Sequence, residues 1–216
     1  MDIYNFSSVN NISPFAPYYS YSIGIVDVSN EINLETIASN LLVKEKEIIN
    51  KYPSGIDGET GLGKDSVTAR FPHYTLWQYK EFKHLKSIVK KHHDIYCSSL
   101  NVNTDKIYSQ AWFNVMRIGE KINKHSHNIS PYSYLSAHLT VNAKDTKTYY
   151  FNPLSGERWG EDNINGKLTF FPSWIEHETD KVEIEQERIT IALDIYNHTS
   201  FTQDVYDNKK YRWHEL

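Results

Sequence analysis

The sequence predicts a mainly β protein in which helices pack on one face of a sandwich or barrel. Two amphipathic stretches lie in the first half of the chain, at about residues 33–51 and 78–100. From Lys106 to residue 196, hydrophobic and polar residues alternate with a period of two, which is the pattern of half-buried strands. Helices that precede a run of short strands typically form a layer against one face of the sheet.

The chain has 216 residues, enough to bury a substantial core without disulfides. We expect a single domain with three parts. Residues 1–105 contribute an N-terminal arm, a first strand and the supporting helices. Residues 106–196 form the β core, and residues 197–216 form a C-terminal tail.

In the first part, residues 1–20 are polar and aromatic and predict an extended arm, and residues 21–28 predict the first strand. Asn33 can cap the first helix, whose apolar residues recur at three- and four-residue spacing. A loop with four glycines follows, at residues 52–66. Its Gly61-Leu62-Gly63-Lys64 segment follows a helix and lacks the spacer of a phosphate-binding loop, so we expect a pocket wall or lid there.

Six strands are expected in the β core, with turns at Ser155-Gly156 and Asn165-Gly166 between some of them. In chain order the expected strands are residues 107–118, 132–142, 147–152, 166–171, 175–182 and 187–196.

Composition and charge narrow the class of function. The net charge of −4 gives no reason to expect binding to nucleic acid or to a membrane surface. No apolar stretch approaches the ~20 residues that span a bilayer, and the N-terminus lacks the pattern of a signal peptide. The lone Cys97 suits a reducing compartment, so we expect a cytoplasmic protein. The expected partner is a small-molecule or peptide substrate, and the Tyr- and Trp-containing tail is compatible with an oligomer.

The strand expected at residues 187–196 carries a buried charge. Alternation directs four aliphatic side chains to one face, where the helices cover them, so Arg188 and Thr190 face into the barrel. A buried arginine needs an acidic partner or an anionic ligand. Glu187 faces the other way, and Asp194 lies about 20 Å along the strand. A ligand carboxylate is therefore an open alternative to a salt bridge.

Three histidines are candidate metal ligands. His125 and His127 are two residues apart, so their imidazoles point the same way in an extended chain. His177 follows the apolar stretch from Phe170 to Trp174, where a histidine is unusual unless it has a chemical role. Neutral imidazole binds iron, zinc, copper and nickel. We therefore predict one metal site on the barrel, formed by His125, His127 and His177.

The order of these residues resembles that of a known family. His125-Ser126-His127 precedes the Phe-Pro-Ser-Trp-Ile-Glu-His segment at residues 171–177, which precedes Arg188-Ile189-Thr190. Trp112-Phe113-Asn114 and Gly119 also correspond to the family's motifs. The pattern is similar to that of the 2-oxoglutarate/Fe(II)-dependent oxygenases. It is most like a small phage and bacterial type with His-x-His, Phe-Pro-Ser-x-x-x-His and Arg-Ile-Ser motifs.

The resemblance implies a double-stranded β-helix core, also called a jelly roll or cupin-like fold, with flanking helices. It implies Fe(II) bound by the three histidines, with 2-oxoglutarate and O2 as co-substrates. The far carboxylate of 2-oxoglutarate would meet Arg188 and Thr190, and Asn114 would help to hold it. The expected activity is hydroxylation of an unidentified substrate, with release of succinate and CO2.

The sequence departs from the family at two places. Most members of the wider superfamily bind iron with two histidines and a carboxylate, whereas the corresponding position here is His127. The strand segment Leu135-Ser136-Ala137-His138 replaces a pattern without histidine, so His138 is either a core histidine or a contact near the metal. Tyr134 and Trp174 are further expected contacts, as walls of the substrate pocket.

Because His127 replaces the usual carboxylate, two alternatives stay open. One is a three-histidine, cupin-like dioxygenase that uses O2 without 2-oxoglutarate, for which Arg188 would have no co-substrate to bind. The other is a non-catalytic jelly-roll binding protein, which would not bind stoichiometric metal.

Overall fold

The computed structural model describes residues 1–8, 13–103, 106–127, 134–197 and 213–216. The first residues of the strand expected at 132–142 and most of the expected tail lie outside these ranges. None of the helices in the described ranges is both long and apolar enough to cross a membrane.

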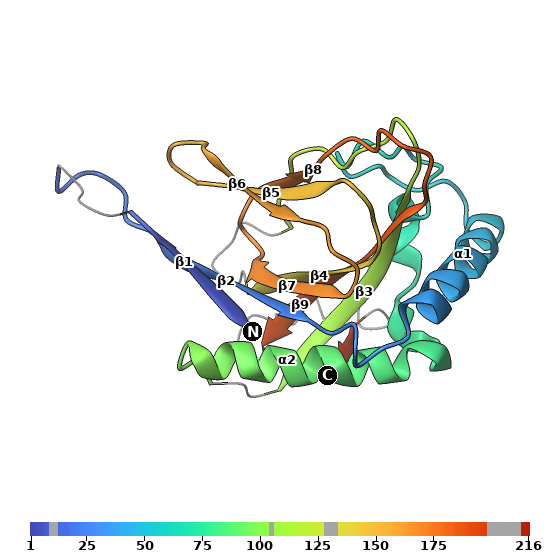
Figure 1. Ribbon diagram of the computed structural model, residues 1–216, viewed down its shortest axis with the longest axis horizontal. Coiled ribbons are helices and arrows are strands. Elements are labelled where there is room, and N and C mark those ends of the chain that lie inside the picture. Colours follow the sequence, from blue (N-terminus) through green and yellow to red (C-terminus); the bar gives the residue numbers. More distant parts are fainter. Residues whose placement is uncertain (9–12, 104–105, 128–133, 198–212) are drawn as a thin grey trace.

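Two antiparallel sheets face each other in the molecule (Figure 1). The larger has seven strands in the order β1-β2-β7-β4-β9-β3-β10 and the smaller has three in the order β6-β5-β8. This arrangement confirms the predicted jelly-roll core. The strands of the larger sheet are β1 (Asp2–Ser7), β2 (Ser20–Asp27), β3 (Ile107–Met116), β4 (Leu135–Asn142), β7 (Lys167–Pro172), β9 (Arg188–Asn197) and β10 (His214–Glu215). Those of the smaller sheet are β5 (Lys147–Phe151), β6 (Arg158–Asp162) and β8 (His177–Thr179).

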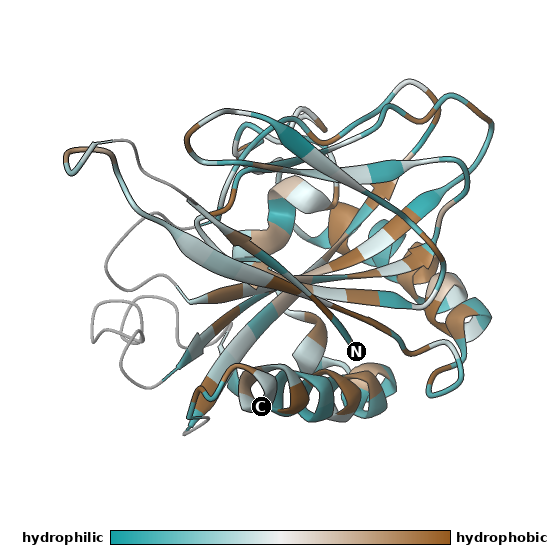
Figure 2. Cartoon of the chain, turned by 60° about the vertical axis from the view of Figure 1, so that its left-hand side comes forward, coloured by the Kyte–Doolittle hydropathy of each residue, from teal (hydrophilic) through white to brown (hydrophobic). Residues whose placement is uncertain are grey.

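Two α-helices cover the larger sheet on its outer face (Figure 1). Helix α1 spans Leu34–Lys51, and the Asn33 side chain caps it by accepting a hydrogen bond from the Thr36 backbone N–H at 2.8 Å. Helix α2 spans Lys83–Ser99. Its ribbon alternates between hydrophobic and hydrophilic residues, as an amphipathic helix must (Figure 2).

Helix α2 starts later than the sequence predicts. Three short 3-10 turns precede it, at Thr68–His73, Leu76–Gln78 and Lys80–Phe82. Trp77 and Phe82 are both buried there. In a continuous α-helix these two side chains would point about 140° apart, whereas the extended backbone at Tyr79 between the turns lets both reach the core.

The aliphatic face of β9 packs against the helices, as predicted. The side chains of Ile189, Ile191, Leu193 and Ile195 are at most 1% exposed and share one core with residues of α1 and α2. The opposite face of the strand therefore points between the two sheets, and its residues line a cavity there. Strand pairing on both sides of β9, with β3 and β4, fixes this alternation.

Three of the strands are not evident from sequence. The expected arm contains β1, which pairs with β2 along its whole length. Strand β6 pairs with β5, and its Trp159 contacts Tyr4 and Phe6 of β1 at ring-centroid distances of 5.0 and 5.5 Å. Strand β10 pairs with β3. These strands depend on partners distant in the chain, so local alternation alone does not predict them.

Candidate metal centre

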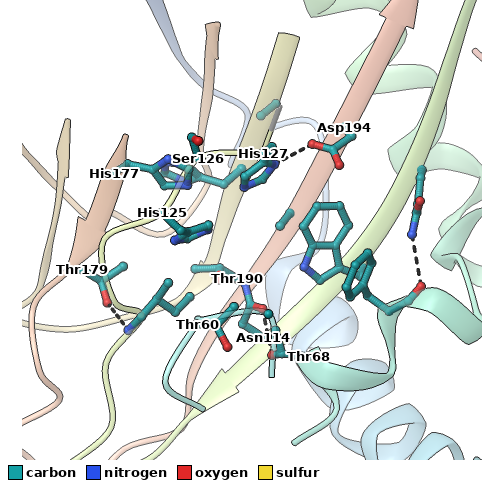
Figure 3. A pocket seen from close by; sticks show the side chains of 18 of the residues that line it. Thr60, Thr68, Asn114, His125, Ser126, His127, His177, Thr179, Thr190 and Asp194 are labelled. Atoms are coloured by element: carbon teal, nitrogen blue, oxygen red, sulfur yellow. Dashed lines mark hydrogen bonds and ion pairs between the residues drawn. The ribbon is translucent and has the colours of Figure 1, made fainter. Parts of the chain in front are cut away.

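The three candidate ligands meet at one end of the cavity between the sheets (Figure 3). The ligand atoms of His125, His127 and His177 all lie within 4.8 Å of one another. His125 and His177 form an isolated β-bridge, in which each backbone N–H donates to the other's carbonyl at 3.0 and 2.8 Å. The His127 N–H donates to the Ser173 carbonyl at 2.9 Å. Backbone pairing therefore holds the three imidazoles together.

Each imidazole is oriented through its Nδ1 atom. Nδ1 of His125 lies 2.8 Å from the Asn123 carbonyl, and Nδ1 of His177 lies 3.1 Å from the Ile175 carbonyl. A carbonyl only accepts, so both Nδ1 atoms carry the proton and both Nε2 atoms present a lone pair. Nδ1 of His127 lies 2.5 Å from Oδ1 of Asp194. Metal-binding histidines in proteins are commonly held in this way.

Burial keeps the imidazoles of His125 and His177 neutral. Desolvation, reinforced by the neighbouring His127, lowers the pKa of His125 from 6.5 to about 4. The pKa of His177 is also lowered well below its ordinary value, again chiefly by burial. Neutral imidazole is the form that binds a divalent transition metal. The spacing of the three histidines, together with the free lone pairs of His125 and His177, fits a single divalent metal ion such as Fe(II).

Arg188 lies deep in the same cavity and is 1% exposed. Its Nε donates to the Thr146 hydroxyl at 3.2 Å, and its Nη1 lies 3.9 Å from Sδ of Met116. Within the described ranges of the chain it forms no ion pair. Burial lowers the pKa of Arg188 to about 10, so it remains charged at neutral pH. The alternative salt bridge is wrong, because Asp194 contacts His127 and Glu187 lies 4.0 Å from Arg117.

A chain of hydrogen bonds leads to the Thr190 hydroxyl (Figure 3). The Thr68 hydroxyl donates to Oδ1 of Asn114 at 2.9 Å, and Nδ2 of Asn114 donates to Oγ1 of Thr190 at 3.2 Å. Thr190 therefore accepts one bond and keeps its own proton to donate into the cavity. Thr68 was not predicted, because it is 46 residues from Asn114 in a 3-10 turn and no motif marks it.

His138 lines the middle of the cavity, where it pairs with Ala192 across the strands. Its Nε2 lies 2.6 Å from the Tyr150 hydroxyl. Burial, followed by the charge of Arg188, lowers the pKa of His138 from 6.5 to about 3. The histidine is therefore a neutral group at the centre of the cavity, close to where a ligand between Arg188 and the three histidines would lie.

The His138 pKa predicts how the stability of metal-free protein depends on pH. In the unfolded chain His138 binds a proton below about pH 6.5, whereas in the folded protein it stays neutral down to about pH 3. The free energy of unfolding therefore falls as pH falls through this window. At pH 5 this histidine alone should cost about 2 kcal/mol. The His138→Gln variant should lose about 2 kcal/mol less between pH 7 and pH 5 in urea unfolding. An unchanged pH dependence would contradict a neutral, buried His138.

Two expected pocket residues lie elsewhere. Tyr134 precedes the first residue of β4, so it does not follow the strand's alternation, and its hydroxyl contacts His93 of α2 at 3.2 Å. Trp174 lies in the turn after β7 and packs edge-on against Tyr21 at 5.4 Å. Neither lines the cavity, and the prediction of both as pocket walls is corrected accordingly.

The cavity measures about 310 Å³ and changes character along β9. Arg188 and Thr190 make its deep end polar and positive. From Ala192 onward along β9, its far end is aromatic and is lined by Phe71, Trp112, Tyr196 and Trp213. His127 lies towards this far end, since it contacts both Asp194 and Trp112.

The glycine-containing loop forms part of the cavity wall through Asp57, Gly58 and Thr60. The Asp57 carboxylate accepts the backbone N–H groups of Gly61 and Gly63 at 3.0 and 2.8 Å. Both glycines have φ near +80°, which other residues rarely adopt. The Asn123 N–H donates to the Thr60 carbonyl at 2.8 Å, which joins the loop to the segment before His125. These glycines therefore shape a turn over the cavity.

Comparison with known proteins supports the predicted resemblance. The family described as "Putative 2OG-Fe(II) oxygenase" matches residues 110–194, which include the three histidines, Arg188 and Thr190. No curated protein matches the chain by sequence.

Two solved structures share the fold. A prolyl-4-hydroxylase from Pseudomonas putida superimposes with a TM-score of 0.56 at 10% identity, covering 82% of this chain and 92% of that one. An oxidoreductase of the 2OG-Fe(II) oxygenase family from Burkholderia pseudomallei gives a TM-score of 0.50 at 12% identity, covering 82% and 84%. At these identities the likeness shows the jelly-roll fold of such enzymes.

Proposed function

We propose that this protein is a 2-oxoglutarate-dependent oxygenase that hydroxylates a C–H bond. Its residues 110–194 match a family described as 2OG-Fe(II) oxygenases, for which Fe(II), 2-oxoglutarate and O2 are the implied cofactor and co-substrates. His125, His127 and His177 bind the iron, and Arg188 and Thr190 hold the far carboxylate of 2-oxoglutarate. The products of each turnover are the hydroxylated substrate, succinate and CO2.

Arg188 carries the proposal. A charged guanidinium that is 1% exposed and forms no ion pair in the described part of the chain is unfavourable unless an anion occupies the cavity with it. A planar carboxylate matches its paired N–H donors. Thr190 is two residues further along the same face of β9 and adds a hydroxyl donor. The three histidines lie towards the other end of the cavity. This arrangement suits 2-oxoglutarate, which has a carboxylate at one end and chelates the metal at the other.

The side chains of this site bind, orient and exclude water. When bound, iron supplies the oxidising chemistry, in which 2-oxoglutarate is decarboxylated and one oxygen atom of O2 enters the substrate C–H bond. The histidines bind through Nε2 because Nδ1 is occupied in each. Neutral His138 offers a polar contact without adding charge. The loop at Asp57 and Thr60 narrows the cavity and reduces its access to water.

The aromatic end of the cavity is the proposed substrate side. The rings of Phe71 and Trp112 lie 5.5 Å apart, and those of Tyr196 and Trp213 lie 4.6 Å apart. Nε2 of Gln110 donates to the Phe71 carbonyl at 3.1 Å and helps to hold this wall. Aromatic faces carry partial negative charge and attract the C–H groups of a saturated ring or chain. A prolyl residue is the first substrate class to test, because one of the solved structures that share the fold is a prolyl-4-hydroxylase.

Anaerobic titration tests the proposal. Metal-free protein is titrated with Fe(II) and then with 2-oxoglutarate, while the visible charge-transfer band of the chelated co-substrate is followed. We expect a saturable band, and after admission of O2 a substrate-dependent release of succinate. Iron binding without a band would favour the three-histidine dioxygenase. Absence of iron binding would favour a non-catalytic barrel.

The Thr68→Val variant tests the hydrogen-bond chain to Thr190. Without the Thr68 hydroxyl, the Asn114 amide can rotate and the Thr190 proton is no longer directed into the cavity. The loss of one neutral hydrogen bond costs about 1 kcal/mol, so the KM for 2-oxoglutarate should rise about fivefold with little change in kcat. Thr68→Ser keeps the hydroxyl and should restore the KM. A change in kcat alone would argue against this chain.

A further inference from the structure

The candidate iron site lacks a negatively charged ligand. Three neutral imidazoles leave the charge of a divalent ion uncompensated, and charged Arg188 lies in the same cavity. Iron sites of this kind more commonly include a carboxylate among the ligands. A nearby negative charge would therefore favour metal binding, even without direct contact to the ion.

Two acidic residues line the cavity within the described ranges, Asp57 and Asp194. The oxygens of Asp57 are occupied by the turn around it, since Oδ1 accepts from Thr60 and Gly63 and Oδ2 accepts from Gly61. Asp57 therefore has a structural partner for each oxygen. Asp194 is the cavity carboxylate that contacts a candidate ligand.

Asp194 is held firmly against His127 (Figure 3). Its Oδ1 lies 2.5 Å from Nδ1 of His127 and accepts a second bond from the Ser136 hydroxyl at 3.0 Å. Ser136 is its cross-strand partner on β4, so sheet register fixes the contact. The His127 and Asp194 side chains are 9% and 19% exposed. Little water is available to screen the interaction between them.

We propose that Asp194 is a positioning residue that acts through His127. Its negative charge lies behind the His127 imidazole and takes the place of the charge of the missing carboxylate ligand. The proposal rests on the function proposed above. His125 and His177 donate to neutral carbonyls, whereas His127 donates to an anion. A charged acceptor makes a shorter and stronger bond and raises the basicity of Nε2 on the opposite side of the ring.

Cobalt binding measures the effect without requiring turnover. Co(II) affinity of the metal-free protein is measured by chelator competition for the wild type, Asp194→Asn and the control Glu45→Gln. Glu45 is a buried acid that pairs with Arg117 away from the cavity. We expect Asp194→Asn to weaken Co(II) binding about 10- to 100-fold and Glu45→Gln to leave it unchanged.

A double-mutant cycle separates charge from structure. The His127→Asp variant supplies a carboxylate ligand directly, so adding Asp194→Asn to it should cause no further loss of Co(II) affinity. An equal loss in both backgrounds would overturn the proposal, because Asp194 would then act on the fold rather than through His127. Unchanged Co(II) affinity in the single variant would also overturn it. Failure of the wild type to bind Co(II) would instead contradict the proposed function.

Discussion

The Arg188→Met variant should lose 2-oxoglutarate while keeping its metal. Removing one partner of a buried, hydrogen-bonded charge pair costs about 2–5 kcal/mol, so the Kd for 2-oxoglutarate should rise roughly 30- to 5,000-fold. The metal ligands come from other segments and do not contact Arg188 through any hydrogen bond. Co(II) affinity should therefore change little. Anaerobic titration of each variant with metal and then with 2-oxoglutarate gives both values.

A comparison of two 2-oxo acids tests whether Arg188 binds the far carboxylate in particular. The wild type should bind 2-oxoglutarate much more tightly than 2-oxopentanoate, which has a methyl group at the far end. The Arg188→Met variant should bind the two about equally. The exposed Arg158, which lies 3.4 Å from Glu178, offers a control, since Arg158→Met should keep the selectivity. Retained selectivity in Arg188→Met would show that another group binds the carboxylate.

The same variant should not be less stable without ligand. Arg188 is buried without an ion pair in the described part of the chain, and a methionine of similar shape removes the cost of desolvating its charge. The metal-free, ligand-free variant should therefore have a Tm equal to or above that of the wild type. With cobalt present, 2-oxoglutarate should raise the wild-type Tm and leave that of the variant unchanged. The arginine would then contribute to binding at the expense of stability.

The sequence predicts the geometry of the site better than its details, for a physical reason. Period-two alternation depends only on local backbone geometry, so it correctly directs Arg188 and Thr190 to the face opposite the aliphatic residues of β9. His125 and His177 are 52 residues apart, and only their shared chemistry and a family resemblance indicated that a bridge would bring them together.

Long-range partners explain what sequence reasoning missed. Asp194 and His127 contact each other from a strand and from a segment outside the strands, and no local pattern reports a contact between residues so far apart in the chain. Thr68 reaches Asn114 from an irregular segment. Tyr134 was expected to line the pocket within a strand that begins at residue 132, whereas β4 begins at Leu135. Each case depends on a long-range contact or on where a strand starts, and both are set by the packing of the whole molecule.

The His177→Ala variant should lose the metal and, with it, the co-substrate. The variant removes one of three candidate ligands, so Co(II) or Fe(II) affinity should fall at least ~100-fold. This loss is larger than the one expected for Asp194→Asn, which removes only a hydrogen-bond partner of a ligand. The backbone bridge between residues 125 and 177 needs no imidazole, so the fold should persist. Millimolar imidazole should enter the cavity that is left and restore part of the metal affinity, which a general loss of structure would not allow.

A second buried histidine controls for the loss of an imidazole as such. His92 of α2 is 5% exposed and contacts Glu31 at 2.7 Å, and it does not line the cavity, so His92→Gln should keep full metal affinity. Arg188→Met and His177→Ala then distinguish co-substrate binding from metal binding. The first variant should keep metal and lose 2-oxoglutarate, whereas the second should lose both. Metal affinity within tenfold of the wild type in His177→Ala would exclude His177 as a ligand. Such a result would contradict the proposed three-histidine site.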